Sequence, residues 1–182
     1  MALRSRPRRE LPPLDAARLQ ELALNYVGKY ATTRAKLRAY LARKIRERGW
    51  DGQAPDLERI ADRFAELGYI DDAAYALGKS RSLAARGYGK RRLTQQLRVA
   101  GVEEGDSQAA TDHADAEAVA AALRFAQRRR IGPFASAAPD PRQREKAIAA
   151  MVRAGHNFAL ARAIAGLAPG GEVYPEALCG LS

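Results

Sequence analysis

Two adjacent carboxylates, Asp71 and Asp72, follow a Gly-Tyr-Ile turn in the stretch ELGYIDDAAYA at residues 66–76. Such a pair could bind a metal ion, supply a catalytic acid and base, or begin a helix. A metal site needs further carboxylates or histidines, and the neighbouring residues offer none. Asp71 is well placed to cap a helix, with Asp72 in a first turn where the helix dipole favours negative charge. We therefore favour a helix start over a metal or catalytic site.

The histidines and serines give no stronger sign of chemistry. His113 and His156 stand 43 residues apart without matching ligands, which argues against zinc. Ser80, Ser82 and Ser107 have no plausible histidine partner in the sequence, so a serine nucleophile is not expected. The sequence predicts no enzyme, no cofactor and no metal site.

The stretch GYGK at residues 87–90 invites comparison with a phosphate-binding loop. It lacks the GxxxxGK[ST] spacing and no strand precedes it, so we interpret it as a turn between helices. The single cysteine, Cys179, excludes an intramolecular disulfide and a cysteine metal site. A reducing, cytoplasmic compartment is the natural expectation.

The charge of the chain points to an anionic partner. The 182 residues carry 31 Lys and Arg, of which 25 are Arg, and a formal net charge of +10. Nucleic acid is the leading candidate, ahead of an acidic protein surface or a membrane. The arginine bias suits bidentate contacts with phosphate or carboxylate, although GC-rich codon usage produces the same bias. No run reaches the 18 or so apolar residues of a membrane span, and a basic N-terminus without an apolar core argues against a signal peptide.

Basic and acidic segments alternate along the chain. Residues 1–50 carry 13 basic and 4 acidic side chains, and residues 51–72 carry 2 and 7. Residues 73–102 carry 7 basic side chains and no acid, whereas residues 103–117 carry 6 acids and no base. A spacing near 50 residues indicates internal repeats.

Apolar residues at spacings of three and four predict helices throughout, and no segment alternates as a strand would. Helix starts are predicted at Asp15, Thr33, Pro55 or Asp56, Asp71, Gly89, about Asp115, about residue 142 and Asn157. The acidic segment 103–115 is predicted to be a short helix or turn, and GPFASAAPDP at 132–141 a loop.

A common frame relates three of these helices. In each, two apolar residues four apart precede a glycine by eight and four positions: Leu41, Ile45 and Gly49; Leu93, Leu97 and Gly101; Ala147, Met151 and Gly155. The frame predicts an all-α protein of three tandem three-helix repeats, stacked into an elongated, curved body. The expected boundaries are a disordered basic tail 1–14, repeats 15–70, 71–114 and 115–167, and a C-terminal tail 168–182.

The stretches ELGYIDDAAYA and ARGYGKRRLTQQLRVAGV resemble the RecX family of bacterial recombination regulators. The resemblance covers residues 20–167, although the loop 132–141 is longer than usual and the helix from Thr33 to Gly49 is one turn longer than its counterpart in the second repeat. The matching positions are Gly68, Tyr69, Ile70, Asp71, Asp72, Tyr75, Ala76, Gly87, Tyr88, Gly89, Leu93, Leu97, Gly101 and Val102.

The resemblance implies a non-enzymatic, monomeric regulator of recombination, DNA repair and the SOS response. Such a protein binds RecA and its filament on single-stranded DNA and inhibits filament growth, ATPase and strand exchange. Whether it also makes a weak direct contact with DNA is left open. The alternative is a stand-alone helix-turn-helix protein, with Gly87–Gly89 as its turn and residues 90–100 as its recognition helix.

Candidate partner-binding residues are the cations of the basic segments. Those at 128–130 also suit a helix C-terminus for dipole reasons alone, and Tyr69, Tyr75 and Tyr88 are predicted to pack at repeat junctions. The candidates are Arg34, Arg38, Arg81, Arg86, Lys90, Arg91, Arg92, Arg98, Arg128, Arg129 and Arg130. The predicted structural caps are Thr33, Gly49, Asp71, Gly101 and Gly155.

Overall fold

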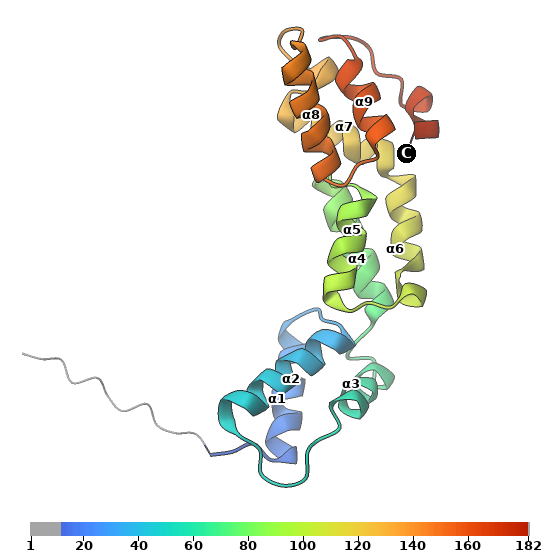
Figure 1. Cartoon of the computed structure of the whole chain (residues 1–182). Helices are drawn as coiled ribbons and strands as arrows, with labels where there is room; N and C mark the ends of the chain where they lie inside the picture. The colour runs from blue at the N-terminus through green and yellow to red at the C-terminus, as the bar shows by residue number, and fades with distance from the viewer. Residues whose placement is uncertain (1–11, 182) are drawn as a thin grey trace, which may run out of the picture. The chain divides into compact units, whose positions relative to one another are not determined.

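The computed structural model describes residues 12–181, and these residues form helices joined by short connections (Figure 1). The chain divides into two compact units: unit 1 ends at Asp71, and unit 2 begins at Asp72. Each unit has its own buried apolar core. The predicted all-α class is confirmed.

Unit 1 packs three helices around a leucine-rich core. Side chains that precede the helices accept hydrogen bonds from backbone N–H groups of the first turn, as Thr33 does from Lys36 and Asp56 from Arg59. Leu19, Leu37 and Leu41 are fully buried between the helices. The helices are α1 (Ala16–Lys29), α2 (Arg34–Arg48) and α3 (Leu57–Glu66).

Leu14 belongs to the core of unit 1 and not to a tail. Its N–H donates to Gly49 O at 3.0 Å, and its carbonyl accepts from Asp51 N at 2.9 Å, forming an isolated parallel bridge with Trp50. The side chain is fully buried. The expected tail 1–14 is therefore too long at this end; residues 1–11 lie outside the described residues.

Unit 2 contains the remaining helices (Figure 1). The acidic segment expected to be a short helix or turn forms a full helix, α6, because Ala110 and Ala114 let it pack closely against α4. The next helix begins at Ala118, not at Asp115. The helices are α4 (Asp72–Ala85), α5 (Lys90–Ala100), α6 (Glu104–Ala116), α7 (Ala118–Arg129), α8 (Pro141–Arg153), α9 (Phe158–Gly166) and the 3-10 helices η1 (Gly132–Phe134) and η2 (Pro175–Leu181).

The C-terminal segment also takes part in the core. Leu178 is 6% exposed and packs with the residues of α7, α8 and α9, with Val173 and Leu181 beside it. A C-terminal tail was expected at 168–182; its described part, residues 168–181, is held to unit 2 by its apolar side chains.

The second helix of the first predicted repeat is longer than that of the second, as expected. α2 has 15 residues and α5 has 11, a difference of about one helical turn. Their ends differ too, because Gly101 adopts a left-handed conformation whereas Gly49 has φ 81° and an extended ψ of 169°. The division into three repeats stays a prediction.

Candidate partner-binding surface

The turn between α4 and α5 is fixed by backbone hydrogen bonds. Tyr88 N donates to Leu83 O at 2.9 Å and Gly87 N to Ala84 O at 2.8 Å, the pattern of a Schellman motif, with Gly87 at φ 70°. A Cβ at Gly87 would lie 2.8 Å from Phe125 N. The turn therefore lies directly against α7.

The two residues that follow α8 cap the first turn of α5. Gly89 N donates to Ala154 O at 3.0 Å, and Arg91 N donates to Gly155 O at 3.2 Å. These bonds satisfy N–H groups that a helix start leaves without intrahelical partners. The backbone that carries the basic residues of α5 is consequently held on two sides, by α7 and α8.

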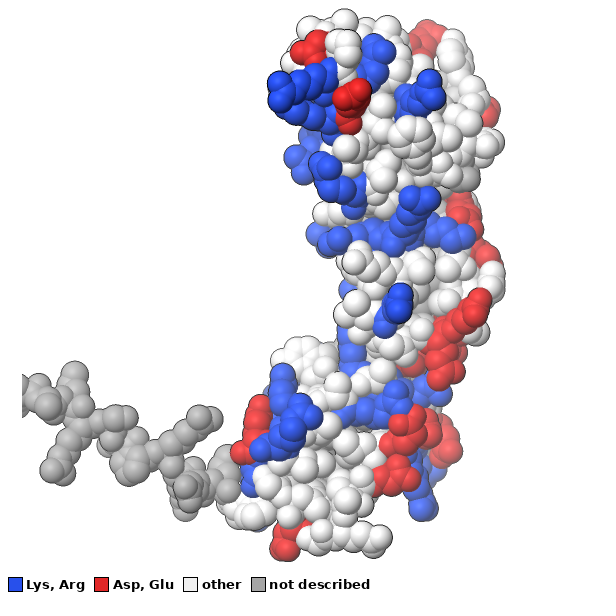
Figure 2. All heavy atoms as spheres, in the orientation of Figure 1, with Lys and Arg blue, Asp and Glu red and all other residues white. Residues whose placement is uncertain are grey.

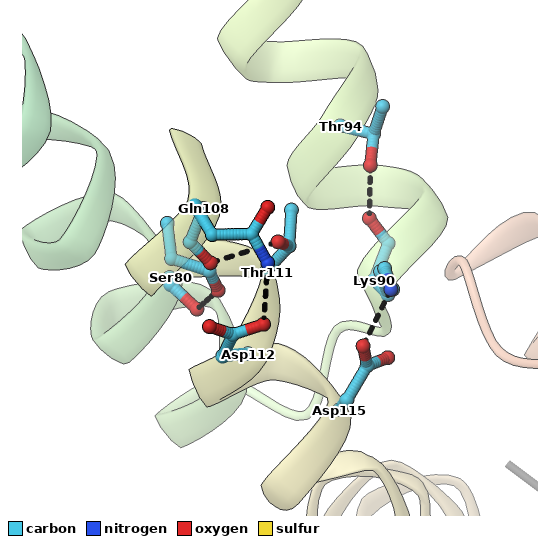
Figure 3. A network of polar contacts seen from close by, with 8 residues as sticks. Ser80, Lys90, Thr94, Gln108, Thr111, Asp112 and Asp115 are labelled. Atoms are coloured by element: carbon cyan, nitrogen blue, oxygen red, sulfur yellow. Dashed lines mark hydrogen bonds and ion pairs between the residues drawn. The ribbon is translucent and has the colours of Figure 1, made fainter. Parts of the chain in front are cut away.

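Three cations occupy the first turn of α5. Lys90, Arg91 and Arg92 stand at the positive end of the helix dipole, where cations are disfavoured, and this turn contains no acid. Lys90 is neutralised by Asp115 of α6 at 2.5 Å (Figure 3). Arg91 and Arg92 are exposed, and neither forms an ion pair with an acidic side chain of residues 12–181. Cations at this end of a helix cost stability, so Arg91 and Arg92 remain candidates for contact with an anionic partner.

The ring of Tyr88 contacts the guanidinium groups of two neighbouring arginines. The guanidinium carbons of Arg86 and Arg92 lie 5.3 and 5.9 Å from the centre of its ring, a cation–π arrangement that limits their freedom. Tyr88 itself is partly buried and packs against both apolar clusters of unit 2. We name Arg86, Arg91 and Arg92 the junction surface; Figure 2 shows a band of basic side chains where α5 meets α8, with acids along α6.

Arg128 contributes to the structure beneath this surface. Its guanidinium donates to Arg86 O, and that of Arg124 donates to Ala84 O at 3.2 Å, so both serve the carbonyl end of α4. Arg129 lies over the Phe125 ring at 5.9 Å. These contacts give the arginines of α7 structural roles that the sequence did not reveal.

The remaining candidates are not among the residues of the junction surface. Arg34 and Arg38 of unit 1 form ion pairs with Asp62 and Glu58 of α3, at 4.0 Å for the first pair. The structure therefore ties these two arginines to α3. Arg81, Arg98 and Arg130 are exposed on unit 2.

A buried serine has the histidine partner that the sequence did not predict. Ser80 of α4 is 1% exposed, and its hydroxyl donates to Ala110 O at 2.8 Å (Figure 3). His113 Nδ1 lies 3.0 Å from Ser80 Oγ. A hydroxyl has one proton to give, so the imidazole N–H must be the donor in the second bond. Ser80 thus joins α4 to α6 and does not have the geometry of an activated nucleophile.

Replacing Ser80 by alanine is expected to lower the free energy of unfolding of unit 2 by about 1 to 2 kcal/mol, because Ala110 O and His113 lose a buried partner. Urea unfolding followed by circular dichroism measures the change. Ser82→Ala, an exposed position on the same helix, is the control and should shift stability by less than about 0.5 kcal/mol. Equal effects of the two substitutions would contradict the assignment.

His156 is a second buried polar group at the junction. It is 2% exposed, and its Nε2–H donates to Gly87 O at 3.1 Å. Burial lowers the pKa of this imidazole below its ordinary value of 6.5, and the hydrogen bond to Gly87 opposes the shift. The neutral ring therefore belongs to the folded junction.

The lowered pKa of His156 predicts acid sensitivity. Below its ordinary pKa of 6.5 the unfolded chain takes up a proton that the folded chain does not, so the stability contribution is complete above that value and is lost as the pH falls below it. The free energy of unfolding should fall by up to about 1.4 kcal/mol per pH unit more steeply in the wild type than in His156→Gln. Urea titrations at several pH values would reveal equal slopes if the assignment is wrong.

Sites of other kinds are not found among residues 12–181. This part of the chain brings together no group of three or more His, Cys, Asp or Glu side chains suited to a metal ion. Within the same residues, every helix is too short or too polar to span a bilayer. The fold and the site define an all-α protein with an exposed cationic surface on a fixed backbone.

Comparison with known proteins gives the family. A family model described as the second three-helix domain of RecX matches residues 71–110. The regulatory protein RecX of Myxococcus xanthus is 32% identical over 170 residues, which cover 87% of this chain and 88% of the relative. RecX of Agrobacterium fabrum is 33% identical over 140 residues, 75% of each chain. The chain belongs to the RecX family of regulatory proteins.

Solved structures agree in fold. The crystal structure of RecX from Lactobacillus salivarius superposes with a TM-score of 0.59 at 17% identity, covering 81% of this chain and 92% of that chain. A second RecX crystal structure gives a TM-score of 0.57 at 21% identity, covering 82% of this chain and 70% of that one. The helical-repeat fold is thus shared at low sequence identity.

Proposed function

We propose that the protein regulates RecA by binding RecA filaments on single-stranded DNA and inhibiting their growth, ATPase and strand exchange. Membership of the RecX family supports a regulatory role. The observation that carries the proposal to this site is the junction surface, where exposed arginines stand at the unfavourable end of a helix dipole. The protein would act as a monomer without catalysis or cofactor.

The junction surface suits contact with an ordered anionic assembly. Guanidinium groups bind carboxylates and phosphates in bidentate fashion. The turn that carries Arg86, Arg91 and Arg92 is held by hydrogen bonds to Ala154 and Gly155, so little conformational entropy is lost on binding. A rigid contact of this kind that bridges neighbouring RecA subunits would block addition at the growing end or favour disassembly.

The helix-turn-helix alternative gains one supporting observation and meets one obstacle. Exposed cations at the start of α5 are what a recognition helix would present to DNA. However, the turn at Gly87 and Gly89 packs against α7 and α8, where added Cβ atoms would lie 2.8 Å from Phe125 N and 2.3 Å from Gly155 O. This packing favours a protein-supported contact surface over a turn exposed to a DNA groove.

Co-sedimentation with RecA separates the two functions. RecA filaments assembled on single-stranded DNA with a non-hydrolysable ATP analogue should carry the protein into the pellet. RecA that has not assembled into filaments should carry much less of the protein. Tight binding to bare duplex DNA, with log affinity falling by about 0.9 per phosphate contact per log unit of salt, and no filament binding would support the alternative instead.

A further inference from the structure

Three tyrosines of unit 1 form a continuous aromatic stack at the α1–α2 corner. Tyr26 of α1 and Tyr40 of α2 lie with ring centres 4.2 Å apart and planes 12° from parallel. Tyr30, which follows the end of α1, packs against Tyr26 with ring centres 5.4 Å apart and an angle of 51°. Tyr26 and Tyr40 pack on the core, whereas Tyr30 is 59% exposed. The stack therefore runs from the core of unit 1 to its surface.

Cations lie on the same side of α2 as the stack. The guanidinium carbon of Arg43 is 5.7 Å from the Tyr40 ring centre, and Lys44 Nζ is 5.9 Å from it. Lys36 stands one helical turn before Tyr40, a spacing that places it on the same helix face. Glu47 pairs with both Arg43 and Lys44, yet α2 contains seven basic residues and this single acid.

The Tyr30 ring is mostly exposed. Tyr30 adds little to the core, since more than half of its surface remains in water. On the opposite side of α2 the cations form ion pairs, Arg34 with Asp62 and Arg38 with Glu58. The side with the tyrosine stack thus combines exposed aromatic surface with an excess of positive charge.

We propose that this face of unit 1, with Tyr30 at its centre, binds unpaired nucleotides of single-stranded nucleic acid directly. A base stacks on the exposed Tyr30 ring, and the phosphates on either side meet the cations of α2, the combination that serves single-strand binding in general. A duplex hides the faces of its bases, and an acidic peptide would use the cations but not the ring. The inference does not rest on the proposed RecA contact, because it concerns bare strands.

Binding of the full chain to a labelled oligo(dT) without RecA tests the proposal. Tyr30→Ala should raise the dissociation constant about ten-fold, because base stacking on an aromatic ring is lost. Tyr30→Phe should keep near wild-type affinity. The matched control is Tyr174→Ala, which removes a similarly exposed tyrosine, 62% exposed, from unit 2 and should leave the affinity unchanged.

Two further readouts make the outcome decisive. A strand containing 5-iododeoxyuridine should crosslink to Tyr30 on irradiation. An abasic strand of the same length should bind the wild-type protein about as weakly as oligo(dT) binds Tyr30→Ala. Equal affinity of the wild type for abasic and oligo(dT) strands, or unchanged affinity of Tyr30→Ala, would overturn the proposal. Co-sedimentation of Tyr30→Ala with RecA filaments separates this proposal from the proposed function. Binding to oligo(dT) can be lost while binding to RecA filaments remains, and the reverse also holds.

Discussion

Gly155→Ala is expected to destabilise unit 2 by about 3 kcal/mol. The residue has φ 100°, a region that L side chains rarely adopt, and an added Cβ would lie 2.6 Å from Arg92 N and 2.8 Å from Gly89 O. Backbone strain and the clash with another backbone each cost about 1 to 3 kcal/mol. The substitution would push α8 away from α5 and loosen the junction surface. Hydrogen exchange of the α5 and α8 amides in urea measures the change.

Gly78→Ala provides the control for this prediction. Gly78 lies in the middle of α4, is exposed and has no atom within 4 Å of a built Cβ. Alanine favours the helix by about 0.5 to 1 kcal/mol over glycine, so this variant should be slightly more stable than the wild type. If Gly155→Ala were equally harmless, the close approach of α5 and α8 would be wrong.

The double substitution Arg91→Glu with Arg92→Glu should weaken inhibition of RecA about 100-fold while leaving the protein folded. Each charge-assisted hydrogen bond contributes about 1.5 to 3 kcal/mol, and reversal adds repulsion. Stability should stay within about 0.5 kcal/mol of the wild type or rise, because acids suit the first turn of a helix. The concentration for half-inhibition of the RecA ATPase, measured with thermal unfolding of the same samples, tests both parts.

Arg162→Glu is the control reversal on another helix, with half of the charge change of the double substitution. Arg162 is exposed on α9 in the same unit, so its reversal changes the net charge of the unit without touching Arg86, Arg91 or Arg92. It should leave half-inhibition within about two-fold of the wild type, since long-range effects between exposed charges are screened by salt. Equal losses from both variants would show that overall charge, and not the junction surface, determines inhibition.

Local signals in the sequence were sufficient for most of the helices, although not for the full length of α6. The caps at Asp15, Thr33 and Asp56 accept hydrogen bonds from the first turns of their helices, as side-chain chemistry predicts. The apolar frame placed Leu41 and Leu97 in the buried cores. Asp72 lies in the first turn of α4, directly after Asp71. These features depend on residues within one or two turns of each other.

Contacts between distant segments could not be predicted in the same way. The bridge from Leu14 to Trp50 and the hydrogen bond from Ser80 to Ala110 join residues at least 30 positions apart. No periodicity shows which segments meet, so Leu14 was expected in a tail and Ser80 without a histidine partner. Leu178 was missed for the same reason, since Val173, Leu178 and Leu181 follow no sustained helical or strand spacing in a segment rich in small and polar residues.

The candidate site was predictable only in part. The acid-free segment 73–102 drew attention to the arginines that form the junction surface. The contact of Gly89 with Gly155 fixes the backbone of these arginines. In the sequence the contact was signalled only by two glycines, one before the basic helix α5 and the other after α8. The neutralisation of Lys90 by Asp115 and the bond from Arg128 to Arg86 O also required the fold.

ATP hydrolysis by RecA on single-stranded DNA tests the central claim most directly, with the protein added below equimolar amounts while filaments are still growing. The account predicts strong suppression well below one protein per RecA subunit, because a few molecules at filament ends or bridging sites would be enough. No suppression even in excess, together with tight and salt-sensitive binding to bare DNA in the same buffer, would contradict it.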